Sequence, residues 1–278
     1  MKIKKNLFIY FCLFIFSLST LISSFPLPFS KKGNSNIVLD SDITEGVPHR
    51  FRDLTNLNIS GSAEFTPSQV KNLKDAINKP DICIVDLRQE SHGFINDFAI
   101  SFYSIGNDLN NGFTTEETIN TENKLLNSIK IDSNVDIFSK IGRLRKTINV
   151  QSISNENTEV EKNGLKYQRF AVKDGGIPSL SVVDEFVNFI KNKPEDQHLH
   201  YHCDAGEGRT TTFMVLDQIM HNEGDLSLDQ ILSYQYNMGG IILTDDEDRA
   251  SFIDTFYDYV KENKDTNYAT SYSQWISQ

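Results

Sequence analysis

Hydrophobic and polar positions along the chain predict helices and strands that follow one another. Residues 66–79, TPSQVKNLKDAINK, carry apolar side chains at helical spacing behind a Thr-Pro start, which predicts a helix. Residues 82–88, ICIVDLR, form a continuous apolar run of the kind that is buried on both faces of a sheet. A helix that leads into a buried strand favours an α/β architecture.

The same succession returns in the second half of the chain. Strands are predicted at 165–172 and 198–203, and helices at 179–193 and 209–222. Between these parts, residues 94–151 hold short alternating strands and one capped helix candidate, and we expect a small inserted β-rich subdomain there. The fold class we predict for residues 25–278 is therefore α/β, a mixed sheet flanked by helices that carries this insertion.

The first 24 residues have the layout of a secretory signal. Lys2, Lys4 and Lys5 precede an apolar run from Leu7 to Ile22, and small polar residues follow from Ser23. We expect a signal peptide over residues 1–24 and a secreted or cell-envelope protein. An uncleaved membrane anchor is the alternative, although the run is short for a spanning helix.

Charge and cysteine content exclude some classes of protein. A chain of 278 residues with a formal net charge of -11 lacks the basic excess of a general nucleic-acid binder, so we expect no nucleic-acid partner. A site for an anionic ligand must gather its basic residues locally. Beyond Cys12, only Cys83 and Cys203 remain, which are too few for a disulfide framework, although one bridge between them stays open.

Residues 202–213, HCDAGEGRTTTF, carry the clearest chemistry. Gly206 and Gly208 let the backbone curl so that successive N–H groups converge on one point, and the helix that follows adds its positive end. Such a cup stabilises a thiolate at Cys203 and binds an anion, and the planar fork of Arg209 can hold two phosphate oxygens. The motif follows a predicted strand, at the edge where open α/β sheets bind ligands. These features predict a phosphate held opposite a cysteine nucleophile.

Together with IVDLRQESHGF at 84–94, this motif resembles the protein tyrosine phosphatase-like inositol polyphosphate phosphatases, the cysteine phytases of bacteria. Three further stretches fall in the order that this family shows: FR at 51–52, YQRFAVKDGGIP at 167–178 and ILSYQYNMGG at 231–240. The likeness covers nearly all of the chain after residue 24. It implies a tyrosine-phosphatase-like fold and a phosphatase that hydrolyses phosphate monoesters of inositol polyphosphates such as phytate without a metal or other cofactor. With the signal-like N-terminal stretch, we expect this phosphatase to be exported.

The resemblance also implies residue roles. Cys203 would attack phosphorus to form a phosphocysteine, with Arg209 stabilising the transition state. His202 would support the loop, and Thr210 would donate a hydrogen bond to the sulfur. Asp174 would be the general acid, although a turn aspartate before two glycines is the plain alternative. Substrate contacts would come from Asp204, Ala205, Gly206, Glu207, Gly208, Arg52, Asp86 and His92.

Some features depart from the family pattern or leave alternatives open. Gly175 follows Asp174 where a bulkier residue is common, Glu207 places an acid inside the phosphate loop, and IILTDDEDR at 241–249 is acidic where lysines are expected. A basic cluster either supplies substrate contacts or is a solvated surface; its members are Lys140, Arg143, Arg145 and Lys146. A phosphotyrosine or phosphoinositide phosphatase is the alternative enzyme, and a non-catalytic phosphate-binding module the alternative class.

Overall fold

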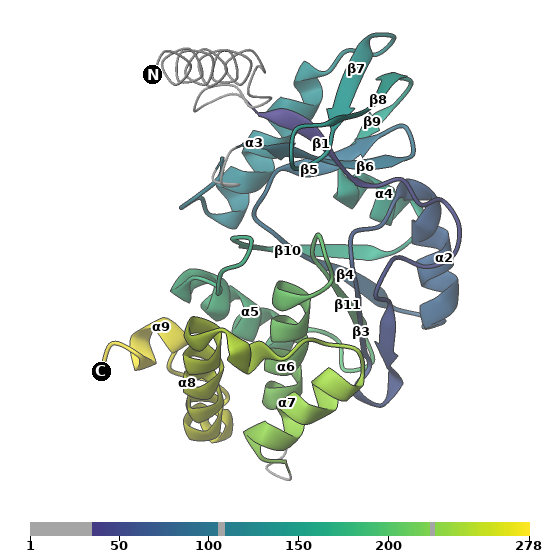
Figure 1. The fold of residues 1–278 in the computed structure, drawn as a ribbon. Coiled ribbons are helices and arrows are strands. Elements are labelled where there is room, and N and C mark those ends of the chain that lie inside the picture. Colours follow the sequence, from purple (N-terminus) through teal and green to yellow (C-terminus); the bar gives the residue numbers. More distant parts are fainter. Residues whose placement is uncertain (1–34, 105–108, 223–225) are drawn as a thin grey trace, which may run out of the picture.

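The computed structural model describes residues 35–104, 109–222 and 226–278. The expected signal peptide, with Cys12, lies outside these residues. The chain folds into two sheets flanked by helices, which is the mixed α/β class predicted from the sequence (Figure 1). The five-stranded sheet has the order β10-β4-β11-β3-β2, in which only β2 is antiparallel to its neighbour. Its strands are β2 Arg52–Leu54, β3 Ile59–Ser62, β4 Ile82–Arg88, β10 Lys166–Val172 and β11 His198–His202.

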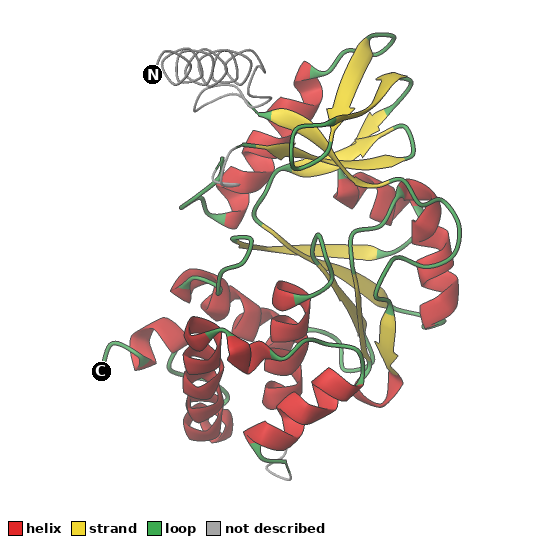
Figure 2. Cartoon of the chain, viewed as in Figure 1, coloured by secondary structure: helices red, strands yellow, loops and turns green. Residues whose placement is uncertain are grey.

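Helices cover both faces of the five-stranded sheet (Figure 2). On one face lie α2 Pro67–Ile77 and α4 Glu156–Lys162. On the other face lie α5 Leu180–Asn192, α6 Gly208–His221, α7 Leu228–Asn237, α8 Glu247–Asn263 and α9 Tyr272–Trp275. Residues Arg209 to Met220 of α6 are all buried, so the helix that follows the Cys203 motif runs through the core of the molecule.

Successive side chains along a strand point to opposite faces of the five-stranded sheet, and the two faces differ in polarity. Cys83, Val85 and Leu87 of β4 join the large apolar core under α5 and α6. The residues between them point to the α2 and α4 face, where Ile82 and Ile84 are apolar but the next positions are charged. In β11 the same alternation puts three histidines on the α2 and α4 face, namely His198, His200 and His202.

The second sheet has six strands in the order β8-β7-β1-β6-β5-β9, and α3 Thr115–Ser128 packs beside it. Its strands are β1 Asn36–Ser41, β5 His92–Ile95, β6 Phe98–Tyr103, β7 Asn134–Phe138, β8 Leu144–Asn149 and β9 Ile153–Ser154. We expected this β-rich part to be an insertion of residues 94–151. The sheet instead takes β1 from the beginning of the described chain and extends to Ser154, because β1 pairs with both β6 and β7.

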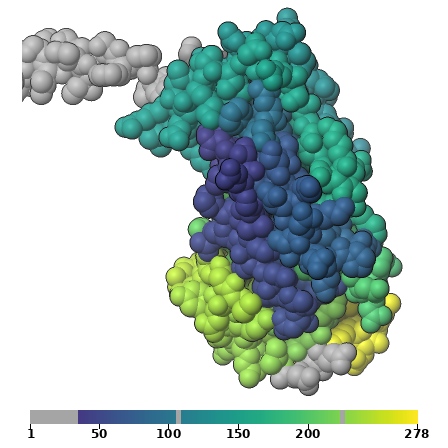
Figure 3. Space-filling model, turned by 90° about the vertical axis from the view of Figure 1, so that its right-hand side faces the viewer, coloured from purple at the N-terminus to yellow at the C-terminus, as the bar shows by residue number. Residues whose placement is uncertain are grey.

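In the view of Figure 1 the six-stranded sheet lies above the five-stranded sheet, and α6, α7 and α8 lie below both. Figure 3 shows the purple and blue N-terminal part of the described chain between the teal region at the top and the yellow-green C-terminal region at the bottom. Among the described residues, no helix combines the length and the apolar character needed to cross a membrane. Cys83 and Cys203 are both free thiols. Cys83 pairs in register with Leu199, four residues before Cys203 and therefore about 13 Å away, so the bridge left open by the sequence does not form.

Candidate active site

The loop of residues 203–208, here called the Cys203 loop, joins the end of β11 to the first residue of α6. Cys203 is only 3% exposed, and the hydroxyl of Thr210 donates a hydrogen bond to its sulfur at 3.1 Å. The N-terminal turn of α6 brings unpaired N–H groups and the positive end of the helix dipole to the same place. The structure thus puts Cys203, the nucleophile predicted from the sequence, beside the N-terminal end of α6, where a negative charge would be stabilised.

Gly206 lets this loop lie directly against the end of β3. Its φ of +70° is left-handed, and a Cβ there would lie 2.4 Å from the backbone nitrogen of Ala63. Two hydrogen bonds fix the loop from outside: the amide of Glu64 donates to the carbonyl of Asp204 at 3.1 Å, and Arg52 Nη1 donates to the carbonyl of Gly206 at 3.0 Å. Residues outside the loop, on β2 and just after β3, therefore hold it in its curled shape.

Glu90 binds the two terminal nitrogens of the Arg209 guanidinium with both of its carboxylate oxygens. Arg209 Nη1 donates to Oε2 at 2.7 Å and Nη2 to Oε1 at 2.8 Å. Nη1 also donates to the carbonyl of Val172 and Nη2 to Oδ1 of Asp174, both at 3.0 Å. The buried Nε has no hydrogen-bond partner among the described residues. The Nε and Nη2 side of the fork therefore faces the position where an anion would bind, with Asp174 on part of it.

Asp174 lies in the loop of residues 173–179 between β10 and α5, here called the Asp174 loop. Its side chain is 47% exposed and reaches Arg209, so the structure brings the predicted general acid to the same fork as the predicted nucleophile loop. Gly175 has a φ of +70°, with no atom within 4 Å of a Cβ placed there. The residue after Asp174 thus adds conformational freedom and no packing.

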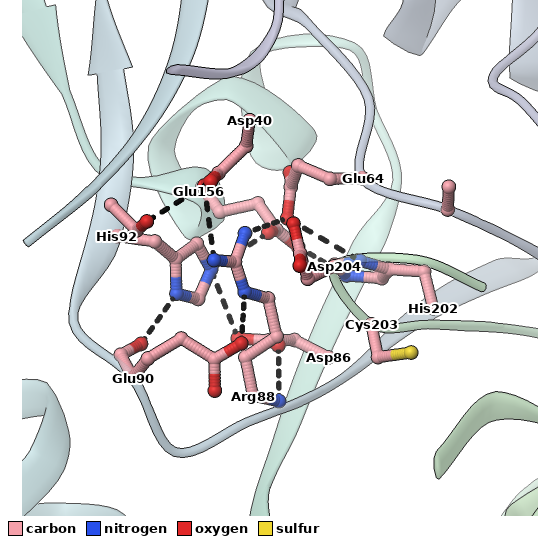
Figure 4. Close-up of polar contacts among 12 residues, drawn as sticks. Asp40, Glu64, Asp86, Arg88, Glu90, His92, Glu156, His202, Cys203 and Asp204 are labelled. Atoms are coloured by element: carbon pink, nitrogen blue, oxygen red, sulfur yellow. Dashed lines mark hydrogen bonds and ion pairs between the residues drawn. The ribbon is translucent and has the colours of Figure 1, made fainter. Parts of the chain in front are cut away.

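A buried network of ion pairs lies behind the loop, on the α2 and α4 face. Arg88 is at its centre and contacts three carboxylates, those of Asp40 at 3.0 Å, Glu64 at 2.6 Å and Glu90 at 3.0 Å (Figure 4). Burial alone would raise the pKa of Glu90, but Arg209 and Arg88 lower it well below its usual value. Glu90 therefore stays ionised and bridges two guanidinium groups.

His202 belongs to this network through Glu156, to which its Nε2 is hydrogen-bonded at 2.8 Å. Burial would lower the pKa of His202, but Glu156 raises it to about 9. Glu156 also accepts from His92 at 3.1 Å, so one carboxylate joins β11 to β5. His202 thus supports the Cys203 loop from behind, as a charged and fully buried group.

The expectation that Asp86 and His92 line the pocket is wrong. Both are essentially fully buried. Oδ2 of Asp86 accepts from the Tyr167 hydroxyl at 2.7 Å and contacts Arg169 Nε at 3.0 Å. Burial and Arg88 would lower the pKa of His92, but Asp86 and Glu122 raise it to about 10. Both residues are part of the buried framework because α2, α4 and the second sheet cover this face.

Arg52, expected to contact substrate phosphate, is also buried, at 6% exposure. Its Nη1 holds the carbonyl of Gly206 and its Nη2 donates to the Thr211 hydroxyl at 3.2 Å. Burial and the neighbouring Arg50 lower its pKa to about 10, an effect that the Cys203 sulfur opposes. Arg52 therefore supports the Cys203 loop through the Gly206 carbonyl and the first turn of α6 through Thr211.

Charged side chains surround the Cys203 loop on the outside. Glu207 points outward, 49% exposed, and pairs with Arg50 at 3.2 Å. Lys140, at the tip of the β7–β8 hairpin, pairs with Asp204 of the loop and brings the second sheet to the site. Of the other members of the basic cluster, Lys146 pairs with Asp42, whereas Arg143 and Arg145 are exposed.

Two groups of residues in the buried network have ligand atoms within 4.8 Å of one another, a spacing that would suit a metal ion. They are Glu64, His92 and Glu156, and Asp86, Glu156 and His202. Arg88 binds Oε2 of Glu64, and Arg169 and Tyr167 bind Oδ2 of Asp86, so each group already has a carboxylate oxygen with a cationic or hydroxyl partner, whereas Oε1 of Glu64 has none among the described residues. We therefore assign these residues to the ion-pair network.

Sequence reasoning missed several residues of the site. Glu90 and Arg88 lie inside the stretch VDLRQESHG, where charged residues at every second position from Asp86 to His92 indicate a single polar face. That alternation was the available signal. Glu64 and Glu156 lie in unrelated stretches and reach the network only through the tertiary fold.

A family model and several solved structures that resemble this chain all point to one family. Residues 85–221 match the family model PTPlike_phytase, described as Inositol hexakisphosphate. A PTP-like phytase from Bdellovibrio bacteriovorus is 29% identical, with a TM-score of 0.79, over 91% of this chain and 97% of that one. A PTP-like myo-inositol phosphatase from Mitsuokella multacida, in complex with myo-inositol-(1,3,4,5)-tetrakisphosphate, is 31% identical with a TM-score of 0.81 over 90% of this chain.

A curated relative, effector protein hopD2 of Pseudomonas syringae pathovar tomato, is 26% identical over 80% of this chain. The chain spans 52% of that relative and 50% of the Mitsuokella chain, which is about half the length of each.

Proposed function

The chain belongs to the protein tyrosine phosphatase-like phytase family, and on this premise we propose that it is a cysteine-dependent phosphatase that hydrolyses phosphate monoesters of inositol polyphosphates. The observation that carries the proposal is the placement of the Cys203 sulfur, the Arg209 fork and the Asp174 carboxyl around one anion-binding turn. A non-catalytic phosphate-binding module would not need this combination of nucleophile and acid.

In the first step, the Cys203 thiolate attacks phosphorus, so that an S–P bond forms as the bond to the leaving oxygen breaks. Phosphate oxygens take the Arg209 Nε and Nη2 donors, which displaces Asp174 from Nη2. Asp174, in its protonated form, then gives its proton to the leaving alkoxide. The loop amides and the N-terminal turn of α6 stabilise the charge on the transferring phosphoryl group.

In the second step, water attacks the phosphocysteine and the S–P bond breaks. The Asp174 carboxylate accepts a proton from that water, and inorganic phosphate leaves. The Thr210 hydroxyl, already 3.1 Å from the sulfur, stabilises the thiolate as it departs. Each step conserves charge and needs no group beyond the residues of the chain, the substrate and water.

The substrate class rests on the local charge around the Cys203 loop. In a chain with a net charge of -11, Lys140 lies beside the loop and Arg143 and Arg145 are exposed on the same hairpin. Such a group of cations suits a substrate with several phosphates better than a monophosphate. The tetrakisphosphate complex of the Mitsuokella relative supports the same class.

The proposal is tested by phosphate release from phytate, with a chelator present and Cys203→Ser as the inactive variant. Cys83→Ala serves as the matched control, because it removes the other described thiol, which is buried in the core. We expect release by the wild type and the control and none by Cys203→Ser at an unchanged melting temperature. Equal release by Cys203→Ser would overturn the proposal.

The same assay on a phosphotyrosine peptide and a phosphoinositide decides between substrate classes. Faster release from either of these than from phytate would replace the inositol polyphosphate assignment with the alternative enzyme while leaving the cysteine mechanism intact.

We also propose that residues 1–24 direct export. The lysine-led apolar run of this stretch supports it. Mass spectrometry of the mature protein would then find an N-terminus near residue 25, whereas an intact Met1 in a membrane fraction would support the anchor instead.

A further inference from the structure

Arg249, at the start of α8, contacts both loops of the site. It comes from the acidic stretch 241–249, which the sequence left without a role. Its Nη2 donates to the carbonyl of Gly175, the residue after Asp174, at 3.4 Å. A Cβ placed on Gly208 would lie 3.3 to 3.5 Å from three atoms of its guanidinium, so the planar group lies against the end of the Cys203 loop.

The position of Arg249 is fixed by its own helix. Arg249 is 6% exposed, its amide donates to Oδ1 of Asp246 at 3.0 Å, and its Nη1 pairs with Oδ2 of that residue at 3.4 Å. Asp246 is the N-cap of α8, a 17-residue helix that packs against α6. The guanidinium thus extends from a rigid element, with its rotamer set by a carboxylate.

The Asp174 loop needs an external support of this kind. Gly175 adopts a left-handed φ and Gly176 follows it, so side chains add no packing at these two positions. In the proposed mechanism, phosphate oxygens replace Asp174 on Nη2 of Arg209, a contact of 3.0 Å in this structure, at the stage when the acid must be placed. The contact of Arg249 with Gly175 uses a backbone carbonyl and is independent of the substrate phosphate.

On these contacts we infer that Arg249 is a positioning residue that holds the Asp174 loop against the Cys203 loop and so places the general acid on the leaving oxygen. The inference rests on the proposed phosphatase function and deepens it. Arg249 donates hydrogen bonds to Gly175 and Asp246, so it acts through the loop that carries Asp174.

The test compares leaving groups. Arg249→Gln is assayed on phytate, whose alkoxide leaving group needs a proton, and on p-nitrophenyl phosphate, whose leaving group does not. We expect kcat/KM on phytate, which reports only the first chemical step, to fall by about 30-fold to 100-fold, in line with the cost of misplacing a catalytic group by about 1 Å. On the aryl phosphate, kcat/KM should fall by no more than about 3-fold, and Arg249→Lys should restore part of the loss because it keeps one donor.

A double-mutant comparison separates positioning from general damage. In a background of Asp174→Asn, adding Arg249→Gln should slow phytate hydrolysis by less than about 2-fold, because the group that Arg249 positions is already removed. Lys261→Gln is the control, since it removes one exposed positive charge from the same helix. It should leave both rates unchanged.

Equal slowing of both substrates by Arg249→Gln, or a full additional loss in the Asp174→Asn background, would overturn the inference. Failure of the proposed function has a different signature, because Cys203→Ser would then match the wild type on both substrates.

Discussion

Glu90 and Arg209 form a two-bond ion pair in which both terminal nitrogens of the guanidinium donate to both carboxylate oxygens, at 2.7 and 2.8 Å. The same Glu90 oxygen that takes Nη2 also accepts from Arg88 Nε at 3.0 Å. The residue that would bind phosphate is thus oriented by a carboxylate that is itself fixed by the buried network. Because Glu90 fixes the Nη1 and Nη2 end of the guanidinium, it also decides that the Nε and Nη2 edge is the one left for the substrate.

The variant Glu90→Gln should therefore impair catalysis. It removes the negative charge shared by two buried guanidinium groups and puts an amide N–H₂ where one of them needs an acceptor. We expect kcat/KM for p-nitrophenyl phosphate to fall by about 100-fold, and inhibition by inorganic phosphate to weaken in parallel, because the fork loses its orientation. Glu195→Gln, at an exposed position, is the matched control. A loss of stability with an unchanged kcat/KM would contradict the orienting role.

The hydrogen bond from Thr210 to the Cys203 sulfur predicts a defect in the second chemical step. Thr210→Val keeps the shape of the side chain and removes the donor, so the departing thiolate loses its stabilisation. A loss of about 1.4 kcal/mol, typical of a hydrogen bond to a charged group, corresponds to about 10-fold slower breakdown of the phosphocysteine. Rapid-quench experiments with p-nitrophenyl phosphate should then show a burst of nitrophenol followed by a slower steady state. Thr210→Ser, which keeps the donor, should show no larger burst than the wild type.

Local sequence patterns predicted much of the architecture, because helices and buried strands depend on nearby residues. The predicted strand at 82–88 coincides with β4, and the predicted helix at 179–193 with α5 Leu180–Asn192. The composition of the second sheet could not be predicted in the same way. The strand β1 is joined to β6 by pairing across some 60 residues, and only the tertiary fold decides that partnership.

In the site, too, features set by neighbouring residues could be predicted, and features set by the tertiary fold could not. The Cys203 loop was predicted because its glycines, cysteine and arginine are close together in the chain, whereas Asp86 and His92 were assigned to the wrong side of the framework. A polar face at every second position is visible in the sequence, but the sequence does not state whether solvent or helices cover that face. In the structure α2 and α4 cover it, and the charges pair with one another.

The close approach of Gly206 to β3 predicts a large loss of stability in Gly206→Ala. The new Cβ would lie 2.4 Å from the Ala63 nitrogen and 2.7 Å from the Ser62 carbonyl oxygen, which are backbone atoms that cannot move away cheaply. A left-handed φ adds about 1 kcal/mol of strain, so we expect a loss in the free energy of unfolding of about 3 kcal/mol or more. Urea denaturation at neutral pH measures it.

Gly46→Ala is the matched control for that measurement. Gly46 has a similar φ of +67°, but no atom lies within 4 Å of a Cβ placed there, so only the strain of about 1 kcal/mol remains. If Gly206→Ala cost no more than Gly46→Ala, the close packing of the Cys203 loop on β3 would be refuted.

The raised pKa of His202 predicts that stability falls in alkaline solution. Glu156 raises the pKa of His202 from 6.5 to about 9 in the folded protein, with Glu64 and Asp86 contributing from neighbouring elements. Because the folded pKa lies above the unfolded one, the stabilisation is fully present below pH 6.5 and is lost as the pH rises through 9. The difference corresponds to on the order of 3 kcal/mol, at about 1.4 kcal/mol per pH unit.

Urea denaturation of the wild type and His202→Gln between pH 6 and 10 tests this linkage. The glutamine can still donate to Glu156 but does not titrate, so the variant should be less stable at pH 6 and should approach the wild type near pH 10. The general repulsion of an acidic chain at high pH acts on both proteins and cancels in their difference. His49→Gln, an exposed histidine, should follow the wild-type profile throughout. A constant stability difference between wild type and His202→Gln across this range would show that the His202–Glu156 pair is not charged in the folded protein.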